Sequence, residues 1–344
     1  MKKAVILITV IVLMLTGCVS ADGTKEYSTE IFAMDTYMSV RFYGSDGETA
    51  IKELRSEIRR LEGLLSVNDD NSDIAAVNRA EGSPVKVSGD TAALVERSLV
   101  LSARTDGALD ITVCPVLREW GFTTDSRRIP DRQRLSELLR SVDYRRVTVD
   151  SAAGTITVPK GFMLDCGAVA KGYLGDRLCS ILRERGVGSA LLDLGGNIQT
   201  IGCRQDGSLW RVGIKDPADA SRTVCTISVR DKAVITSGSY ERFFVGDDGK
   251  KYWHIIDPQT GFPADKGLCS VTVIGESGVE CDGLSTALFV MGRDKAAEYC
   301  REHTGTDAVL IGNDGHIFIT AGIAGNTEFR DGIEYTVISS QEEE

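Results

Sequence analysis

The sequence predicts an α+β fold made of mixed, mostly antiparallel sheets with flanking helices. Segments with strand periodicity and segments with helix periodicity follow one another without the regular strand–helix–strand alternation of parallel sheets. The 344 residues contain no internal repeat, no proline-rich linker and no low-complexity run. We therefore expect a single domain over residues 28–340, with a possible division into two interlocked lobes that meet near residue 160.

The first half of this domain is expected to contain three helices. Met38, Val40 and Phe42 predict a strand before the first helix, because apolar residues at every second position share one face of a sheet. Between Glu48 and Leu65, apolar residues recur at intervals of three and four, which predicts an amphipathic helix. The other elements expected in this half are a helix from Thr91 to Ala103, a hairpin from Val147 to Pro159 turned at Ala153 and Gly154, and a helix from about Val169 to Arg185 that Gly186 ends.

The second half is expected to be richer in strands. Strands are predicted at Ala190–Leu194, Trp210–Ile214, Cys225–Ile235, Ser270–Ile274, Ala308–Ile311, Ile317–Thr320 and Tyr335–Ile338. Two helices, near Gly283–Val290 and Lys295–Glu302, are predicted between the fourth and fifth of these strands.

The N-terminus has the pattern of a bacterial lipoprotein signal. A basic head at residues 1–3 precedes an apolar run over residues 4–15, and the run closes on Leu-Thr-Gly-Cys. This pattern predicts a secretory signal over residues 1–17, with an uncleaved anchor helix as the alternative. We expect Cys18 to carry the lipid and residues 18–27 to form a tether. The mature protein would then be anchored to the membrane on its extracytoplasmic (periplasmic) face.

Composition narrows the choice of partners. The net charge of −11 argues against nucleic acid as a partner, and a phosphate-bearing ligand would need local help from a metal or from helix N-termini. The cysteines other than Cys18 are scattered without a CxxC pair or zinc-ligand spacing. In an exported protein these thiols either form disulfides or belong to an organism that lives without oxygen.

Seven sequence blocks, in order, resemble the ApbE-like flavin transferases, which are FAD:protein FMN transferases. The blocks cover nearly all of the chain after the signal. They are MDT (34–36), SVNDDNSDIAAVN (66–78), ALDITVCPVLREWGF (108–122), LDCGAVAKGYLGD (164–176), LLDLGGN (191–197), TSGSYERFF…HIIDPQTGFP (236–263) and CDGLSTALFVMG (281–292). One such block would be weak evidence for the resemblance, whereas seven blocks in the same order are highly specific evidence.

The resemblance implies an ApbE-like flavin transferase fold and a reaction on FAD. In that reaction FAD is bound with Mg²⁺, and its FMN half is passed to a threonine hydroxyl of a partner protein with release of AMP. The implied acceptors are flavin-carrying subunits of membrane electron-transport complexes. Two other classes stay open: a non-catalytic FAD-binding lipoprotein, and a redox flavoprotein. The lack of a Rossmann fingerprint or a CxxC pair weakens the latter.

Asp282 and Thr286 are the predicted metal ligands. They are four residues apart at an expected helix start, so they share one face of that helix. A carboxylate and a hydroxyl are hard oxygen ligands suited to Mg²⁺, which would offset pyrophosphate charge and stabilise the breaking P–O bond. The alternative is a helix cap at Asp282 with Thr286 merely packed. By resemblance, the Ala168 backbone carbonyl is a third metal ligand.

Ala168 lies in the small-residue turn DCGAVAKGY, which leads into a helix. Such a turn allows backbone to approach a phosphate, and Lys171 can add a positive charge. Asp165 precedes the turn and resembles a flavin-contacting position of the family. The alternative is an ordinary strand–helix turn with a solvated Lys171.

Further FAD contacts are implied by the resemblance. Ala108, Leu109 and Asp110 match a stretch that lines FAD, and Asp110 could accept hydrogen bonds from a ribose or ring group. Met34 and Ile256 match further contact positions, Ile256 on the flavin side.

His254 lies in the polar block between Thr236 and Gly261. It is one of three histidines in the chain, and imidazole is the side chain best suited to move a proton near neutral pH. Two roles are open for it. It is either the base that takes the proton of the acceptor threonine, or an orienting group hydrogen-bonded to Asp257.

Asn68 departs from the family pattern, which commonly has a tyrosine at this position. Asn cannot stack on a flat ring system as an aromatic side chain does. Looser packing would admit water to the pyrophosphate or speed release of FMN. We therefore expect Mg²⁺-dependent hydrolysis of FAD to FMN and AMP as an alternative activity, unless Asn68 is a neutral surface change.

Overall fold

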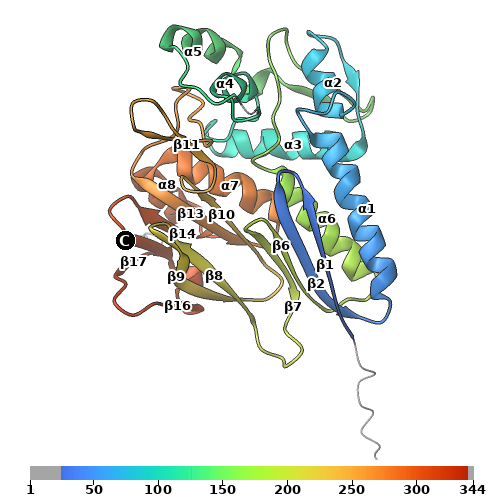
Figure 1. The fold of residues 1–344 in the computed structure, drawn as a ribbon, viewed down its shortest axis with the longest axis vertical. Coiled ribbons are helices and arrows are strands. Elements are labelled where there is room, and N and C mark those ends of the chain that lie inside the picture. Colours follow the sequence, from blue (N-terminus) through green and yellow to red (C-terminus); the bar gives the residue numbers. More distant parts are fainter. Residues whose placement is uncertain (1–24, 125, 340–344) are drawn as a thin grey trace, which may run out of the picture.

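A nine-stranded sheet is the centre of the fold (Figure 1). The structure is a computed structural model that describes residues 25–124 and 126–339. Neighbouring strands are antiparallel except for the last pair, β15 and β17, which is parallel. In spatial order the strands are β1 (Lys25–Ala33), β2 (Thr36–Gly44), β6 (Ser189–Leu194), β7 (Asn197–Gly202), β10 (Ala233–Gly238), β13 (Leu268–Gly275), β14 (Asp307–Gly312), β15 (Ile317–Thr320) and β17 (Tyr335–Ile338).

Three small sheets accompany the central one. The largest of them places a β8–β9 ribbon over one face of the central sheet, where their apolar side chains share a core. The members of the small sheets are β16 (Thr327–Phe329), β9 (Asp219–Val229) and β8 (Trp210–Asp216); β3 (Val85–Lys86), β5 (Thr155–Thr157) and β4 (Thr148–Asp150); and β11 (Phe243–Val245) with β12 (Lys251–Trp253).

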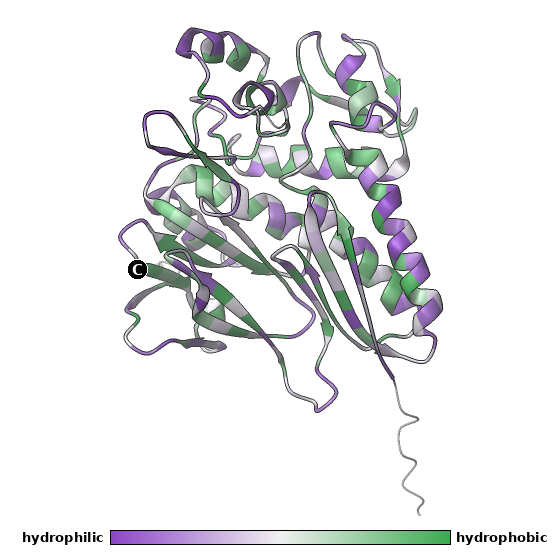
Figure 2. Cartoon of the chain, viewed as in Figure 1, coloured by the Kyte–Doolittle hydropathy of each residue, from purple (hydrophilic) through white to green (hydrophobic). Residues whose placement is uncertain are grey.

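Helices cover the other face of the central sheet. Helices α6 and α7 pack on β7, β10 and β13, while α1 packs on β1 and α6. In Figure 2 the hydrophobic colour follows the strands, and α1 is largely hydrophilic on its outer side. The helices are α1 (Gly47–Leu65), α2 (Asp73–Arg79), α3 (Gly89–Arg104), α4 (Cys114–Trp120), α5 (Arg132–Leu138), α6 (Ala170–Glu184), α7 (Gly278–Met291), α8 (Arg293–Glu302) and α9 (Ala321–Ala324), with short 3-10 turns at Leu139–Ser141 and Tyr144–Arg146.

The α+β fold expected from the sequence is confirmed. The predicted helix over residues 48–65 is α1, and its positions Leu54, Ile58 and Leu61 are fully buried against the sheet. The hairpin predicted over residues 147–159 is β4–β5. The helix predicted near residues 283–290 is longer and begins at Gly278.

The single strand predicted at Cys225–Ile235 is wrong. This segment contains the end of β9 and the start of β10, which belong to different sheets. Asp231 lies between them with a positive φ of 50°, and its carboxylate accepts a hydrogen bond from the Gly202 amide. This left-handed residue turns the chain from one sheet into the other. Strand β1 begins at Lys25, inside the expected tether, and was not predicted.

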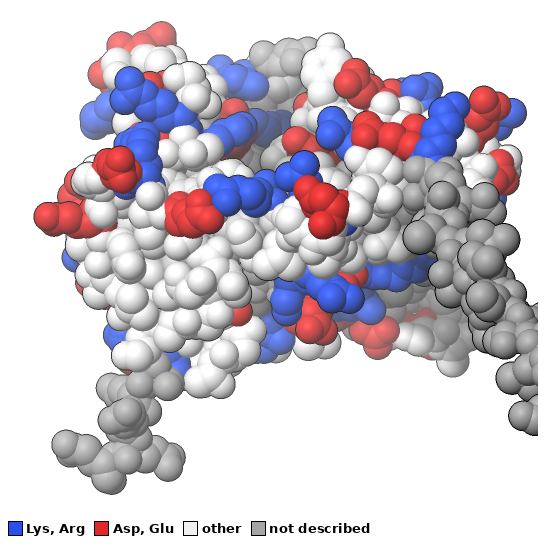
Figure 3. Space-filling model, turned by 90° about the horizontal axis from the view of Figure 1, so that it is seen from below, with Lys and Arg blue, Asp and Glu red and all other residues white. Residues whose placement is uncertain are grey.

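The lipoprotein signal and Cys18 lie outside the described residues. Within residues 25–124 and 126–339, no helix is both long and apolar enough to cross a bilayer. The eight cysteines in these ranges are free thiols, most of them buried. On the face seen in Figure 3, Lys and Arg side chains are interspersed with Asp and Glu side chains.

Candidate active site

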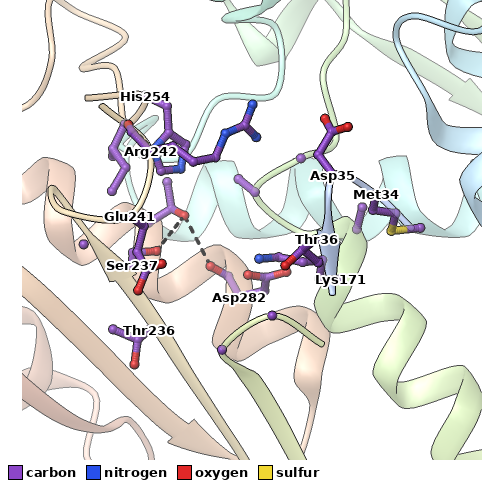
Figure 4. Close-up of a pocket in the computed structure, with 18 of the residues that line it drawn as sticks. Met34, Asp35, Thr36, Lys171, Thr236, Ser237, Glu241, Arg242, His254 and Asp282 are labelled. Carbon is purple, nitrogen blue, oxygen red and sulfur yellow. Dashed lines mark hydrogen bonds between the residues drawn. The ribbon is translucent and has the colours of Figure 1, made fainter. Parts of the chain in front are cut away.

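A cavity of about 820 Å³ opens between the β1–β2 turn, the loop after α3, the start of α6 and the end of β10. Every predicted site residue except Cys18 lines it. These are Met34, Asn68, Ala108, Leu109, Asp110, Asp165, Ala168, Lys171, His254, Ile256, Asp282 and Thr286. Figure 4 shows His254, Arg242 and Ser237 on one side of the cavity and Met34 and Asp35 on the other, with Asp282 between them. The fold thus brings together residues from all the sequence blocks.

Asp282 lies inside α7, against the first turn of α6. Its Oδ2 accepts a hydrogen bond of 2.7 Å from the Gly172 amide. The N-terminus of α7 is capped by Asp176 instead, which accepts bonds of 2.6 and 3.1 Å from the Gly278 and Val279 amides. The alternative in which Asp282 caps its own helix is therefore wrong.

The same contact satisfies an amide at the start of α6. The helix begins at Ala170, so the Gly172 amide belongs to the first turn, whose amides have no partner within the helix. This amide donates to Asp282, and Ala168, just before the helix, lines the cavity. Gly172 permits the contact, since a Cβ at this position would lie 2.2 Å from the Gly278 carbonyl oxygen.

Hydroxyl groups adjoin Asp282 on the cavity wall. The Ser237 hydroxyl, at the end of β10, lies 2.8 Å from the Ser285 hydroxyl and 3.3 Å from the Thr286 hydroxyl. Thr286 Oγ1 also contacts the Asp282 carbonyl oxygen at 3.4 Å. One turn of α7 and the end of β10 therefore present a carboxylate and several hydroxyl oxygens together.

Asp282 has a raised pKa. Its side chain is 6% exposed, and this burial raises the pKa from 3.8 to about 6, against the opposing effect of the Lys171 charge and the Gly172 amide. A buried carboxylate without a full counter-charge favours binding of a cation.

The residues fit a Mg²⁺ ion. Asp282, Thr286 and the Ala168 carbonyl offer one carboxylate, one hydroxyl and one carbonyl oxygen, a donor set suited to a hard cation that keeps waters and phosphate oxygens as its other ligands. Among the described residues there is no cluster of three or more His, Cys, Asp or Glu side chains that could hold a metal.

His254 is held by the backbone of Arg242. Its Nδ1 lies 3.2 Å from the Arg242 carbonyl oxygen, and its amide donates to the same oxygen at 3.1 Å. A carbonyl only accepts, so Nδ1 carries the proton and Nε2 keeps its lone pair. Desolvation and the positive charge of Arg242 lower the pKa of His254 to about 4. The ring is therefore neutral at neutral pH, as a base must be.

The expected hydrogen bond between His254 and Asp257 is not formed. The Asp257 carboxylate is buried and forms an ion pair of 2.8 Å with Lys266, and it also accepts the Gln259 amide at 2.9 Å. Asp257 therefore stabilises its own turn, and the orienting partner of His254 is the Arg242 backbone.

The Asp110 carboxylate is already hydrogen-bonded to other groups of the protein. One carboxylate oxygen accepts bonds from the Thr112 amide and hydroxyl, at 2.8 and 2.6 Å, and the other accepts the Tyr144 amide at 3.0 Å. Burial raises its pKa. Asp110 therefore shapes the cavity wall. These three bonds leave its carboxylate little capacity to accept the hydrogen bonds expected from a ribose or ring group. Asp165 likewise accepts the Gly167 amide at 2.7 Å, which holds the turn before α6.

The β1–β2 turn is a tight two-residue hairpin made of Met34 and Asp35. Both residues have positive φ, 47° and 57°, although neither is glycine. Such turns prefer Asn-Gly or Gly-Gly, so this one is strained. The Met34 amide donates to Glu62 on α1 at 2.7 Å, which holds the turn over the cavity.

Asn68 follows α1 on an exposed loop at the cavity rim. Its side-chain amide donates to the Thr123 carbonyl oxygen at 2.9 Å. It therefore joins two loops that both line the cavity.

Sequence reasoning missed Ser237, Arg242 and Thr36 as cavity residues. Ser237 and Arg242 lie in the polar block TSGSYERFF, whose position at a strand end was the available signal. Thr36 is the first residue of β2, directly after the strained turn. The alternation of buried and exposed residues along β2 gives no sign that Thr36 faces a cavity.

A model of the ApbE family matches residues 34–310 of this chain. The chain belongs to the ApbE family. It is 35% identical to the FAD:protein FMN transferase of Treponema pallidum (strain Nichols), over 94% of this chain and 96% of the relative. It is 30% identical to the FAD:protein FMN transferase of Escherichia coli K12, over 86% of this chain and 88% of the relative.

Solved ApbE structures share this fold. The ApbE protein of Thermotoga maritima superposes with a TM-score of 0.79 at 33% identity, over 85% of this chain and 96% of the other. The flavin transferase ApbE of Vibrio cholerae superposes with a TM-score of 0.78 at 27% identity, over 87% and 98%. The cavity described above thus lies within the part of the chain that matches the ApbE family.

Proposed function

We propose that this ApbE-family chain is a Mg²⁺-dependent FAD:protein FMN transferase. It would bind FAD in the cavity, pass the FMN half to a threonine hydroxyl of an acceptor protein and release AMP. The observation that carries this proposal is the buried Asp282, with a raised pKa and hydroxyl neighbours, on the wall of the cavity that a neutral His254 also lines.

The chain's own residues account for proton transfer and positioning. The acceptor hydroxyl oxygen forms a bond to the FMN phosphorus while the bond between this phosphorus and the AMP oxygen breaks, so that the electron pair leaves with AMP. His254 Nε2 takes the hydroxyl proton, because Nδ1 is bonded to the Arg242 carbonyl. Lys171 and Arg242 place positive charge beside the cavity, which favours a bound pyrophosphate.

Mg²⁺ would be held by Asp282, Thr286 and the Ala168 carbonyl. When bound, it supplies positive charge that offsets the phosphates and the leaving AMP. Asp282 has to be ionised to bind the ion, so binding weakens as the pH falls through about 6.

A second candidate is Mg²⁺-dependent hydrolysis of FAD to FMN and AMP. The observation that favours it is Asn68, which is exposed at the cavity rim and directs its amide to Thr123. Without a stacking side chain at this position, water has easier access to the pyrophosphate.

The cellular setting is part of the same proposal. The acceptors would be threonine-bearing subunits of membrane electron-transport complexes. The enzyme would reach them from the periplasmic face of the membrane, through a lipid on Cys18.

Product analysis tests the function. The soluble form that starts at Val19 is incubated with FAD and Mg²⁺, with and without threonine-bearing peptides. We expect AMP together with a peptide that has gained FMN. AMP without peptide would establish hydrolysis as an intrinsic activity. Tight FAD binding with no AMP in either reaction would contradict an enzyme that cleaves FAD and would favour the FAD-binding lipoprotein.

A further inference from the structure

The cavity extends beyond the residues assigned to FAD and to the metal. Residues 211–215 of β8, with Leu191, Ile198 and Val234 on β6, β7 and β10, line this second part. We call it the β8 groove. The β8 groove starts beside Lys215, whose ammonium lies 3.9 Å from the Glu241 carboxylate. Glu241 directly precedes Arg242 in the chain, so the groove begins next to the site described above.

Strand β8 presents its backbone edge to the β8 groove. It pairs with β9 and is the outer strand of its sheet. Successive side chains of a strand point to opposite faces, yet residues 211–215 all line the cavity. The wall is therefore the edge of the strand, where alternate N–H and C=O groups point away from β9.

The floor of the β8 groove is apolar. Leu191 and Ile198 are half-buried and pack against the core shared with β8 and β9, and Val234, the β10 residue paired with Ile198, is buried beside them. The one acidic neighbour on β6, Asp193, accepts the Gly196 amide at 2.8 Å. An apolar floor beside a polar strand edge suits a polypeptide in extended conformation.

An exposed aromatic pair lies on β1 and β2, at the edge of the same sheet face and across the groove from β8. Tyr37 is 80% exposed and Phe32 is 52% exposed, and their ring centroids are 5.0 Å apart. Tyr37 is two residues from Ser39, the partner of Asp193, so it shares the sheet face of Asp193. Aromatic side chains this exposed beside a cavity are typical of a protein-contact surface.

We propose that the β8 groove binds the acceptor protein as an added strand, which pairs with the edge of β8 and packs against Phe32 and Tyr37. The run of residues 211–215 matches about five residues of an extended chain. From there the acceptor threonine reaches the part of the cavity lined by Ser237 and His254. This inference rests on the proposed transfer, since hydrolysis needs no acceptor.

Photo-crosslinking tests where the acceptor binds. The soluble enzyme with FAD is mixed with a library of short peptides that have a central threonine and a photoreactive residue near it. We expect crosslinks on β8 and on β6–β7. Crosslinks only elsewhere, or none above those of a threonine-free library, overturn the proposal. So does loss of the β8 crosslinks when FAD is raised to saturation, because the nucleotide would then occupy the groove.

A pair of tyrosine variants tests the same surface by kinetics. Tyr37→Ser should lower kcat/KM for the peptide about tenfold through KM, with AMP release in the absence of peptide unchanged. The matched control is Tyr335→Ser. Tyr335 is 45% exposed and stacks on Phe329 with centroids 4.0 Å apart, at the far edge of the central sheet. Equal effects of the two variants, or loss of FAD binding in Tyr37→Ser, overturn the proposal.

The two proposals fail in different ways. If wild-type enzyme attaches FMN to no peptide, the transferase function fails, while the crosslinks still show whether peptides occupy the β8 groove. If peptides gain FMN but crosslink outside the groove, the function stands and the docking surface is wrong.

Discussion

At the scale of single residues, the site depends on one buried carboxylate. Asp282 is held by the Gly172 amide, and burial disfavours its charged form. Sequence spacing could place Asp282 and Thr286 on one helix face, but it could not show that Asp176 caps α7 and leaves Asp282 for the cavity. Long-range contacts of this kind are set by how α6 packs on α7.

Asp282→Asn is expected to stabilise the metal-free protein at pH 8 by roughly 2–3 kcal/mol while abolishing Mg²⁺-dependent AMP release. Between pH 4 and 6 the native state holds the extra proton, because its pKa is about 6 and the ordinary value is 3.8. Stability of the wild type therefore falls as the pH rises through this window. Thermal melting at pH 4 and pH 8 checks this, and equal melting of variant and wild type at pH 8 contradicts it.

The acid limb of the pH–rate profile is expected near pH 6 and should report Asp282. His254 has a pKa of about 4 and stays neutral over this range. Since Mg²⁺ competes with the proton for the Asp282 carboxylate, higher Mg²⁺ should move the limb to lower pH. Rates of AMP release at several Mg²⁺ concentrations measure this, and a limb that does not move would assign it to another group.

Asn68→Tyr is expected to tighten FAD binding by about tenfold and to slow AMP release without acceptor. Tyrosine would offer a ring for stacking at the cavity rim, where Asn68 now bonds Thr123. Fluorescence titration and AMP analysis check the two effects. If the variant hydrolyses FAD as fast as the wild type, Asn68 is not the cause of any hydrolytic activity.

At the scale of elements, the sequence patterns predicted helices better than sheet pairing. The amphipathic pattern of α1 and the glycine that follows α6 are local features, so both helices could be predicted. The break between β9 and β10 depends on Asp231 in a left-handed conformation, which apolar periodicity does not show. Strand β1 was missed because it is an edge strand with few buried positions.

Gly172→Ala is expected to destabilise the protein by about 1–3 kcal/mol and to weaken Mg²⁺ binding. Its Cβ would lie 2.2 Å from the Gly278 carbonyl oxygen and 2.7 Å from Asp282 Cβ, so α6 and α7 must separate. The control is Gly63→Ala on α1, where the Cβ meets nothing within 4 Å, and it should stabilise by about 0.5–1 kcal/mol. Thermal melting with and without Mg²⁺ compares the two, and similar behaviour would contradict close packing at Gly172.

At the scale of the whole molecule, the cavity is built from residues far apart in the chain. Met34 on the first hairpin and Thr286 on α7 line the same space, and the central sheet fixes the distance between them. The sequence blocks identified these residues as a set, but only the fold shows that a second part of the cavity follows the edge of β8. That edge has no sequence motif, because it is made of backbone groups.

The most direct test of this account uses ¹⁸O-labelled water. The enzyme is incubated with FAD, Mg²⁺ and threonine-bearing peptide, and the position of the label is found by mass spectrometry. Attack on the FMN phosphorus predicts an unlabelled FMN–threonine adduct, unlabelled AMP and label only in any free FMN. Label in AMP would mean that the other phosphorus is attacked, and it would contradict the arrangement of His254 and Asp282 proposed here.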